Sequence, residues 1–455
     1  MLPFHIHFGL EGIVGTVLYI VMWLTFLLSL AWKPQVGIYV LAFMLPLQTV
    51  RYRLHGMFLG AQFVDLLLLG VVLGLLIRGE SVIPKTPITK FLLILACFYY
   101  FSLWEGAFFI DVPLPLWITD PRFSDWKNYV EMFFLALVVA SAIKEEKHVR
   151  VLLAIMALSV LALNRNYISL LSGRDLSHFS YELRDEGLLG YAGANGLGAF
   201  EAMVFSFLLS VYGYARRVWL KVAIGILAAT SVYCLMYSFS RGGYVAALAG
   251  LIVVGILKTR KFLILAVVIV LAWQTLLPAS VQQRIEMTTD GTGQLEDHSA
   301  AERLVLWKDA MDLFLRNPVT GTGFETYEYM DRVGPYRDTH NYFVKVLAET
   351  GIIGTALFLI LLWRSMRLGL NLFKSTQNSL WSALALGFVA LMCSALVANF
   401  FGDRWTYQQL DGYLWILLGC VLTGTRIVGE VREPSADETM GPAIIESGLE
   451  PVLKM

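Results

Sequence analysis

Long apolar runs, separated by short polar segments, cover most of the chain. A helix needs about 20 apolar residues to cross the hydrocarbon core of a bilayer. The runs of about that length are residues 13–31, 35–50, 57–77, 89–110, 128–143, 150–164, 192–214, 218–238, 242–257, 262–278, 341–363, 381–399 and 409–426. The second run is short and contains Pro46, so we expect it or its neighbour not to span. The pattern predicts an all-α integral membrane protein, a bundle of about 12 transmembrane helices.

Basic residues predict how these helices are oriented. Loops rich in Lys and Arg usually face the cytoplasm. Three basic residues occur in each of the loops 78–90, 144–150, 216–221, 258–261 and 364–374. The loops that alternate with them, expected on the outer face, are 111–127, 165–191, 237–241, 279–340 and 400–408. Twelve crossings would leave both termini inside, whereas 13 would place Met1 outside.

The predicted organisation has four parts. Residues 1–278 form N-terminal transmembrane helices with arginines in their outer loops, and residues 341–426 form the C-terminal transmembrane helices. Between them, residues 279–340 form one long outer loop of short amphipathic helices, including one that starts near Glu302. Residues 427–455 are acidic and contain three prolines, which predicts a disordered cytoplasmic tail.

Composition excludes several classes of protein. Of 455 residues, 57% are apolar and 15% are charged, whereas soluble domains carry about 25% charged residues. The 35 basic and 35 acidic residues cancel, so the net charge gives no indication of nucleic-acid binding. The outer loops show no recognisable spacing of metal ligands and no glycine-rich nucleotide loop after a strand. We therefore expect no metal, no cofactor and no nucleotide-sugar donor.

Arg241 is the first candidate for chemistry. It stands in Ser240-Arg241-Gly242-Gly243, where one predicted helix stops and the next begins on the outer face. A helix N-terminus with glycines lets an anion approach the backbone, and a guanidinium holds phosphate in a bidentate manner. The alternative is an interfacial arginine that reaches lipid headgroups.

His340 is the second candidate. It precedes the helix that follows the long outer loop, in Asp338-Thr339-His340-Asn341. A neutral imidazole at that position is suited to act as a general base for a hydroxyl. The alternative is a histidine that only caps the helix.

Three more arginines lie on the predicted outer face. Arg184 is followed by Asp185 and Glu186, and an exposed ion pair is its default interpretation. Arg51 and Arg53 depart from the preference for basic residues inside. Either these two contact phosphates or the acceptor, or the orientation differs in this part of the chain.

Several ordered motifs together resemble the O-antigen ligase and polymerase superfamily of bacterial envelope enzymes. They are Arg184-Asp-Glu-Gly-Leu-Leu-Gly190 with Asn195, Ser240-Arg241-Gly242-Gly243, Glu302-Arg303 to Trp307 with Asn317-Pro318-Val-Thr-Gly-Thr-Gly323, and Thr339-His340-Asn341-Tyr342 with Glu349-Thr350-Gly351. The N-terminal helices match only as generic apolar spans.

The resemblance implies a metal-independent, inverting glycosyltransferase of the inner membrane with a periplasmic active site. Such an enzyme transfers a glycan en bloc from an undecaprenyl-diphosphate carrier to an acceptor hydroxyl. By resemblance, Arg184 and Arg241 hold the diphosphate, His340 activates the acceptor, and Asn195 and Arg303 belong to the substrate site.

The acceptor stays open at this point. A lipid A core sugar makes the protein a ligase, the end of a growing glycan makes it a polymerase, and a protein hydroxyl makes it an O-oligosaccharyltransferase. Outside the enzymes, the main alternative is a transporter or flippase of a lipid-linked glycan. Transporters often show internal symmetry and buried ionisable relays. No duplicated half is visible, and the acids inside the apolar runs are isolated in sequence.

Overall fold

The computed structural model describes residues 11–287, 298–333 and 338–432. All the secondary-structure elements in these ranges are helices, as the apolar runs predict. The first seven are α1 (Glu11–Ala31), α2 (Gln35–Met44), α3 (Gln48–Tyr52), α4 (Phe63–Ile77), α5 (Thr89–Phe109), α6 (Pro121–Ala142) and α7 (Glu146–Leu171).

The second half adds the long outer segment and the remaining helices. Two short 3-10 helices, η1 (Tyr181–Leu183) and η2 (Gly187–Ala192), precede α8 (Gly193–Tyr214). They are followed by α9 (Val218–Tyr237), α10 (Arg241–Leu257), α11 (Lys261–Leu271), α12 (Trp273–Leu276), α13 (Ala279–Glu286), α14 (His298–Arg316), α15 (Thr326–Tyr329), α16 (Tyr342–Ser375), α17 (Ser379–Asn399) and α18 (Gln408–Arg432).

Eight helices in the described ranges are long and apolar enough to cross a membrane. Four shorter apolar helices accompany them: α2, α4, α10 and α11. The run 35–50 is not one helix, because α2 ends at Met44 before Pro46 and α3 is separate. The multi-pass helical fold is thus confirmed, while about 12 crossings stays a prediction.

Several helices continue beyond their apolar runs. α16 runs twelve residues past the predicted end at residue 363, and α18 reaches Arg432 instead of residue 426. A helix does not stop where it leaves the hydrocarbon, because its backbone hydrogen bonds also form in water and against other protein surfaces. Of the predicted tail, residues 433–455 lie outside the described residues.

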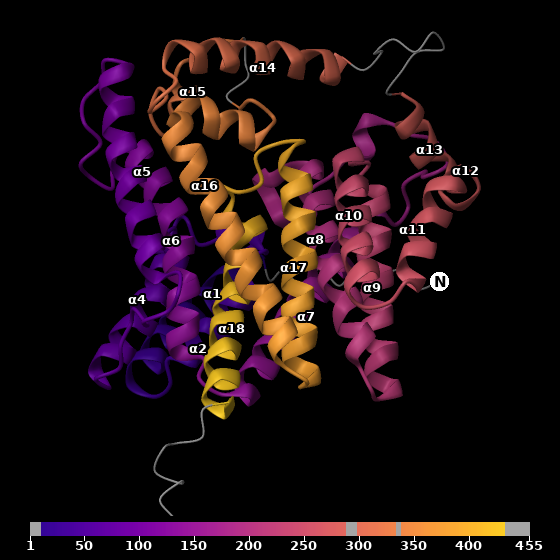
Figure 1. The fold of residues 1–455 in the computed structure, drawn as a ribbon, viewed down its shortest axis with the longest axis horizontal. Helices are drawn as coiled ribbons and strands as arrows, with labels where there is room; N and C mark the ends of the chain where they lie inside the picture. The colour runs from indigo at the N-terminus through magenta and orange to yellow at the C-terminus, as the bar shows by residue number, and fades with distance from the viewer. Residues whose placement is uncertain (1–10, 288–297, 334–337, 433–455) are drawn as a thin grey trace, which may run out of the picture.

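Three of the predicted basic loops, 78–90, 144–150 and 364–374, lie close together at one end of the bundle. Lys144 pairs with Glu80 at 2.8 Å, and the Asn378 amide donates to Glu146 at 3.1 Å. Arg364 also donates to the carbonyl of Pro87. In Figure 1, α14 lies across the opposite end, with α15 just below it and α13 lower, beside α12. The alternation of loops predicted from charge is therefore compatible with the fold.

The described part of the long loop contains α13, α14 and α15; α14 has 19 residues and begins at His298, so it is longer than the short helices predicted and starts before Glu302. On α14, the buried side chains are Leu306, Ala310 and Leu313, which contact Tyr327 and Ala348. Leu304 and Val305 on the same helix are more than half exposed. The loop therefore has a small apolar core of its own, attached to the first turns of α16.

Glycines let residues 318–323 run directly against a kink in α16. Gly351 interrupts the helix with φ of 59°, and Ile352 N–H donates to the Pro318 carbonyl at 2.9 Å. Gly323 N–H donates to the Glu349 carbonyl at 2.7 Å. The glycine motifs at 321–323 and 351 thus serve backbone packing, because no side chain fits between the segments.

We expect Gly323→Ala to destabilise the fold strongly. A Cβ at this position would lie 2.1 Å from Gly106 Cα on α5, and Gly323 has φ of +107°. Either the helix or the loop must therefore move. The midpoint of thermal unfolding in detergent should fall well below that of wild type. Gly429→Ala is the control, since its Cβ meets no atom within 4 Å; equal midpoints for both variants would contradict the close packing.

Candidate active site

The five predicted outer loops come together around two cavities. One cavity, of about 410 Å³, is lined from the loops before α8, between α9 and α10, around α13 and α14, and before α18. The second, of about 480 Å³, is lined from α3, the start of α6, η2, the residues around α15, and residues 403–409. Loops far apart in the sequence therefore share one end of the molecule, as the charge pattern predicts.

The first cavity, which we call the arginine pocket, is lined by five guanidinium groups. They belong to Arg184, Arg241, Arg284, Arg303 and Arg404. No carboxylate is among the described residues that line it. Since Arg184, Arg241 and Arg303 were predicted from the sequence, the structure brings these three candidates into one site.

Arg241 is positioned by a tight helix start. The Ser240 hydroxyl accepts from Gly243 N–H at 3.2 Å and caps α10. A side chain on Gly243 would lie 2.8 Å from the Gly198 carbonyl of α8, and one on Gly242 would meet Phe401. The two glycines therefore allow α8, α10 and the loop before α18 to pack around the arginine.

Arg184 is not in the exposed ion pair that its neighbours suggested. Its Nη2 donates to Asn195 Oδ1 at 2.7 Å, whereas Asp185 pairs with Arg174 at 3.4 Å. The default interpretation from sequence is thus wrong for this residue: the loop turns Arg184 toward α8 and its acidic neighbour away from it. Asn195, the other predicted residue, holds the guanidinium in place.

The described residues that line the arginine pocket carry a surplus of positive charge. Burial lowers the pKa of Arg184, and the nearby Arg284 lowers it further. Burial also lowers the pKa of Arg303, and Arg404 and Arg284 add to the effect. Lowered values mean that the charged forms are under-compensated. An anion with several oxygen atoms in the cavity would relieve this repulsion.

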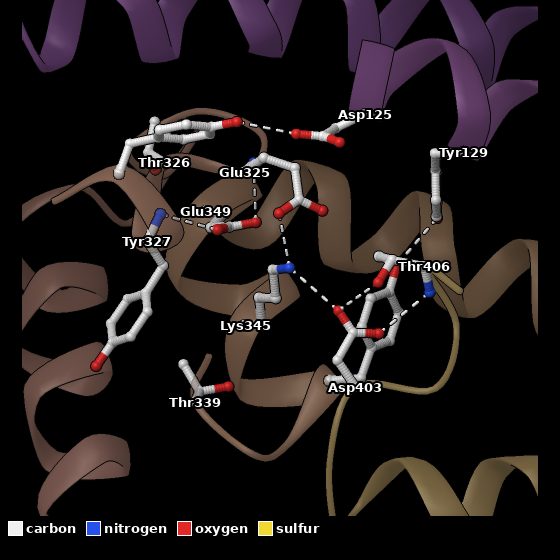
Figure 2. Close-up of polar contacts among 12 residues, drawn as sticks. Asp125, Tyr129, Glu325, Thr326, Tyr327, Thr339, Lys345, Glu349, Asp403 and Thr406 are labelled. Carbon is white, nitrogen blue, oxygen red and sulfur yellow. Dashed lines mark hydrogen bonds and ion pairs between the residues drawn. The ribbon is translucent and has the colours of Figure 1, made fainter. Parts of the chain in front are cut away.

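The second cavity, which we call the acidic pocket, contains a buried ion triad. Lys345 Nζ lies 2.8 Å from Glu325 Oε2 and 3.1 Å from Asp403 Oδ2. Figure 2 shows the lysine between the two carboxylates. Thr406 donates to Asp403 through both its backbone N–H and its hydroxyl. Since all three charged side chains are at most 6% exposed, the triad ties α15, α16 and the loop before α18 together.

Glu349 completes this cluster from the next turn of α16. Its carboxylate accepts from the backbone N–H groups of Glu325 and Tyr327, at 3.1 and 3.0 Å. Glu325 itself has a positive φ of 59°. The motif Glu349-Thr350-Gly351 therefore holds the loop that carries Glu325, which is a positioning role (Figure 2).

His340 lies beside the acidic pocket, in contact with Asp338. His340 Nδ1 is 3.3 Å from Asp338 Oδ2, and Asp338 lines the pocket. Burial would raise the pKa of Asp338, but the hydrogen bond with His340 and the nearby Lys345 lower it to about 2. The carboxylate is thus ionised near neutral pH and can orient the imidazole.

The segment that carries His340 is held by its neighbours. His340 has a positive φ of 52°, and the next residue, Asn341, caps α16 by accepting from Phe343 and Val344 N–H. Trp307 of α14 donates its indole N–H to the Thr339 carbonyl at 3.0 Å. The cap is therefore made by Asn341, so the capping alternative considered for His340 is not needed.

The remaining predicted residues, Arg51 and Arg53, lie at the same end but line neither cavity. Arg51 donates to the Leu45 carbonyl at 2.8 Å and so braces the turn between α2 and α3. In contrast, Gln48 of α3 does line the acidic pocket.

Sequence reasoning missed Arg284, Arg404 and the ion triad. Arg404 could have been found, because it is a basic residue in a predicted outer loop, as Arg51 is. The triad had no such signal: Lys345 lies in an apolar run, and the only other charged residue of that run is Glu349, which is not one of its ion partners.

Comparison with known families bears on the same region. Residues 226–359 match the family model described as O-antigen ligase. This confirms the resemblance suggested by the motifs. The matched segment contains Arg241, Arg284, Arg303 and His340, whereas Arg184 and Arg404 lie outside it. No curated protein matches the chain significantly.

Proposed function

We propose that the protein transfers a glycan from a polyprenyl-diphosphate carrier to an acceptor hydroxyl on the periplasmic side of the bacterial inner membrane. The observation that carries the proposal is the arginine pocket, together with the His340–Asp338 pair at the adjoining acidic pocket. The O-antigen ligase match supports a membrane glycan ligase or polymerase.

The diphosphate would occupy the arginine pocket. Its oxygens suit several guanidinium groups at once, since each guanidinium can donate two parallel hydrogen bonds. The carrier leaves as a diphosphate, and charge develops on its oxygens as the glycosidic bond breaks. Arginines already in place stabilise that charge without reorganisation.

The polyprenyl tail would occupy an apolar groove next to the arginine pocket. The groove measures about 550 Å³ and is lined by side chains of α8 to α13. It shares Tyr244, Val245 and Ile285 with the arginine pocket. A lipid can therefore reach the site sideways from the bilayer while its diphosphate lies among the arginines.

His340 would take the proton of the acceptor hydroxyl. With Nδ1–H directed at Asp338, Nε2 is the basic nitrogen. The acceptor oxygen forms a bond to the anomeric carbon, the bond to the diphosphate oxygen breaks, and the diphosphate leaves with the electron pair. Attack from the side opposite the diphosphate inverts the anomeric centre, and a retained linkage in the product would refute this.

We expect Arg404→Ala to lower kcat/KM for the lipid-linked donor about 10²–10³-fold, the usual loss when one preorganised charge stabiliser is removed. Arg241→Ala should have a similar effect. Arg404→Lys should recover only part, because lysine keeps the charge but loses the planar fork. The measurement is release of undecaprenyl diphosphate from its oligosaccharide in nanodiscs with EDTA.

Arg316→Ala on α14 is the matched control, since this arginine is exposed and outside the pocket. Equal losses in Arg316→Ala and Arg404→Ala would contradict a donor site among the pocket arginines. The acceptor that gains glycan separates ligase, polymerase and protein transferase. Movement of lipid-linked glycan across vesicles without transfer would instead support a transporter.

A further inference from the structure

The two cavities carry opposite charge although they adjoin. Five guanidinium groups and no described carboxylate line the arginine pocket. The acidic pocket is lined by five carboxyl side chains and one amine, that of Lys345. Asp403 lines the acidic pocket and the next residue, Arg404, lines the arginine pocket. The change of sign therefore occurs across a single wall of the site.

The lysine does not neutralise the acidic pocket. It is held between Glu325 and Asp403, which leaves three other carboxyl groups on the wall: Asp125, Glu328 and Asp338. Asp338 faces His340, and Asp125 accepts from the Tyr329 hydroxyl at 2.9 Å. Asp125 comes from the start of α6 and Glu328 from α15, so the negative charge surrounds the cavity from separate elements.

The other lining groups are those that bind saccharides. Amide side chains come from α3, α6 and α18, and the tyrosine rings of Tyr191 and Tyr407 also line the cavity. Carboxylates and amides offer hydrogen bonds in a plane to sugar hydroxyls, while aromatic rings pack on the apolar faces of sugars. The volume of about 480 Å³ lies in the range of small-molecule sites.

The position of the acidic pocket indicates which of the two substrates, donor or acceptor, it binds. If the diphosphate lies among the arginines, the hydroxyl that attacks must come from another direction and reach His340. The acidic pocket borders His340 through Asp338. The donor phosphates are repelled from it by like charge, so the two substrates are kept apart.

We propose that the acidic pocket binds the acceptor sugar and selects neutral or amino sugars over sugars that carry a carboxylate or phosphate. This inference rests on the proposed transferase function. One unit of like charge a few ångströms from Asp125 or Asp338, in surroundings of intermediate dielectric constant, lowers affinity about tenfold or more.

Three saccharide probes of equal length test the selectivity: a neutral glucan oligosaccharide, the same glucan with its C6 hydroxyls oxidised to carboxylates, and a glucosamine oligosaccharide at a pH where its amines are charged. Binding is measured by calorimetry on full-length His340→Asn protein in nanodiscs with EDTA, where transfer does not interfere. We expect the amino and neutral probes to bind at least tenfold more tightly than the oxidised probe.

The Asp125→Asn, Glu328→Gln double variant should reduce that ratio about tenfold. Asp312→Asn, an exposed acid on α14 outside the pocket, should leave it unchanged. Equal binding of the three probes to the parent protein, no binding of any, or the same ratio in the double variant would overturn the inference.

Transfer assays distinguish this failure from failure of the proposed function. Transfer of glycan to neutral and oxidised acceptors at equal rates, with release of undecaprenyl diphosphate, would overturn the selectivity alone. Absence of release with every acceptor, together with selective binding of the probes, would overturn the transferase and leave a saccharide site.

Discussion

Replacement of His340 by alanine is expected to reduce glycan transfer about 10²–10⁴-fold, the usual contribution of a positioned general base. The reason is the geometry of one contact: Asp338 lies 3.3 Å from Nδ1, which in the proposed mechanism leaves the other ring nitrogen to accept the proton of the acceptor. Binding of the donor should change little, because the proposed site of the diphosphate is the arginine pocket, which His340 does not line. Single-turnover release of undecaprenyl diphosphate, with donor affinity measured separately, checks both parts.

The backbone at His340 requires a second variant. The residue has φ of +52°, and alanine tolerates this poorly, whereas asparagine adopts it readily. His340→Asn should therefore fold as wild type and still lose transfer. His178→Ala is the control, because His178 is an exposed histidine on a loop of the same end. Full activity in His340→Asn would show that this side chain is not the base.

Asp338→Asn should lower transfer while leaving the histidine in place. Because the pKa of Asp338 is lowered to about 2, its carboxylate stays ionised at any pH from about 4 upward. Loss of activity on mild acidification would therefore not arise from protonation of Asp338. An Asp338→Asn variant with unchanged rate and pH profile would contradict its orienting role.

Lys345→Met is expected to destabilise the protein by about 3–5 kcal/mol, as usual when one partner of a buried ion pair is removed. The substitution would leave Glu325 and Asp403 buried without their common cation. Burial already raises the pKa of Glu325 well above its ordinary value, although Lys345 lowers it. The measurement is unfolding in detergent, followed by thermal shift and by protease resistance.

A second substitution separates charge from packing. Glu325→Gln in the Lys345→Met background removes one of the stranded charges and should recover part of the stability, since the two sites are coupled. Lys147→Met is the control, because Lys147 pairs with Glu145 at 2.7 Å in an exposed site. Exposed pairs contribute about 0–1 kcal/mol. Equal effects of the two lysine substitutions would show that the buried triad does not stabilise the fold.

Much of the architecture could be predicted because hydrophobicity acts locally. In a bilayer the backbone must form its hydrogen bonds within a segment, so an apolar run of sufficient length becomes a helix. The predicted runs 89–110 and 381–399 differ from α5 and α17 by two residues or fewer at each end. The predicted run 35–50 does not form one helix, because α2 ends at Met44 and α3 begins at Gln48. Pro46 in this run had already indicated the break.

Part of the site could be predicted for a different reason. The alternation of basic loops brought residues 165–191, 237–241, 279–340 and 400–408 to one end, and all four contribute to the arginine pocket or the acidic pocket. The motifs then selected Arg184, Arg241, Arg303 and His340. Neither the motifs nor the charge pattern indicated that Arg51 and Arg53 line neither cavity. A loop can lie at the same end of the molecule as the site and still pack against another helix.

The sequence by itself determined the helical membrane fold, the loops that share one end, and most of the arginines at the site. Only the tertiary structure decided that the end is divided into an arginine pocket and an acidic pocket. The partners of Lys345 are 20 and 58 residues away from it in the chain. Helix formation depends on near neighbours, whereas the electrostatics of a site depend on distances in space between groups that the chain keeps far apart.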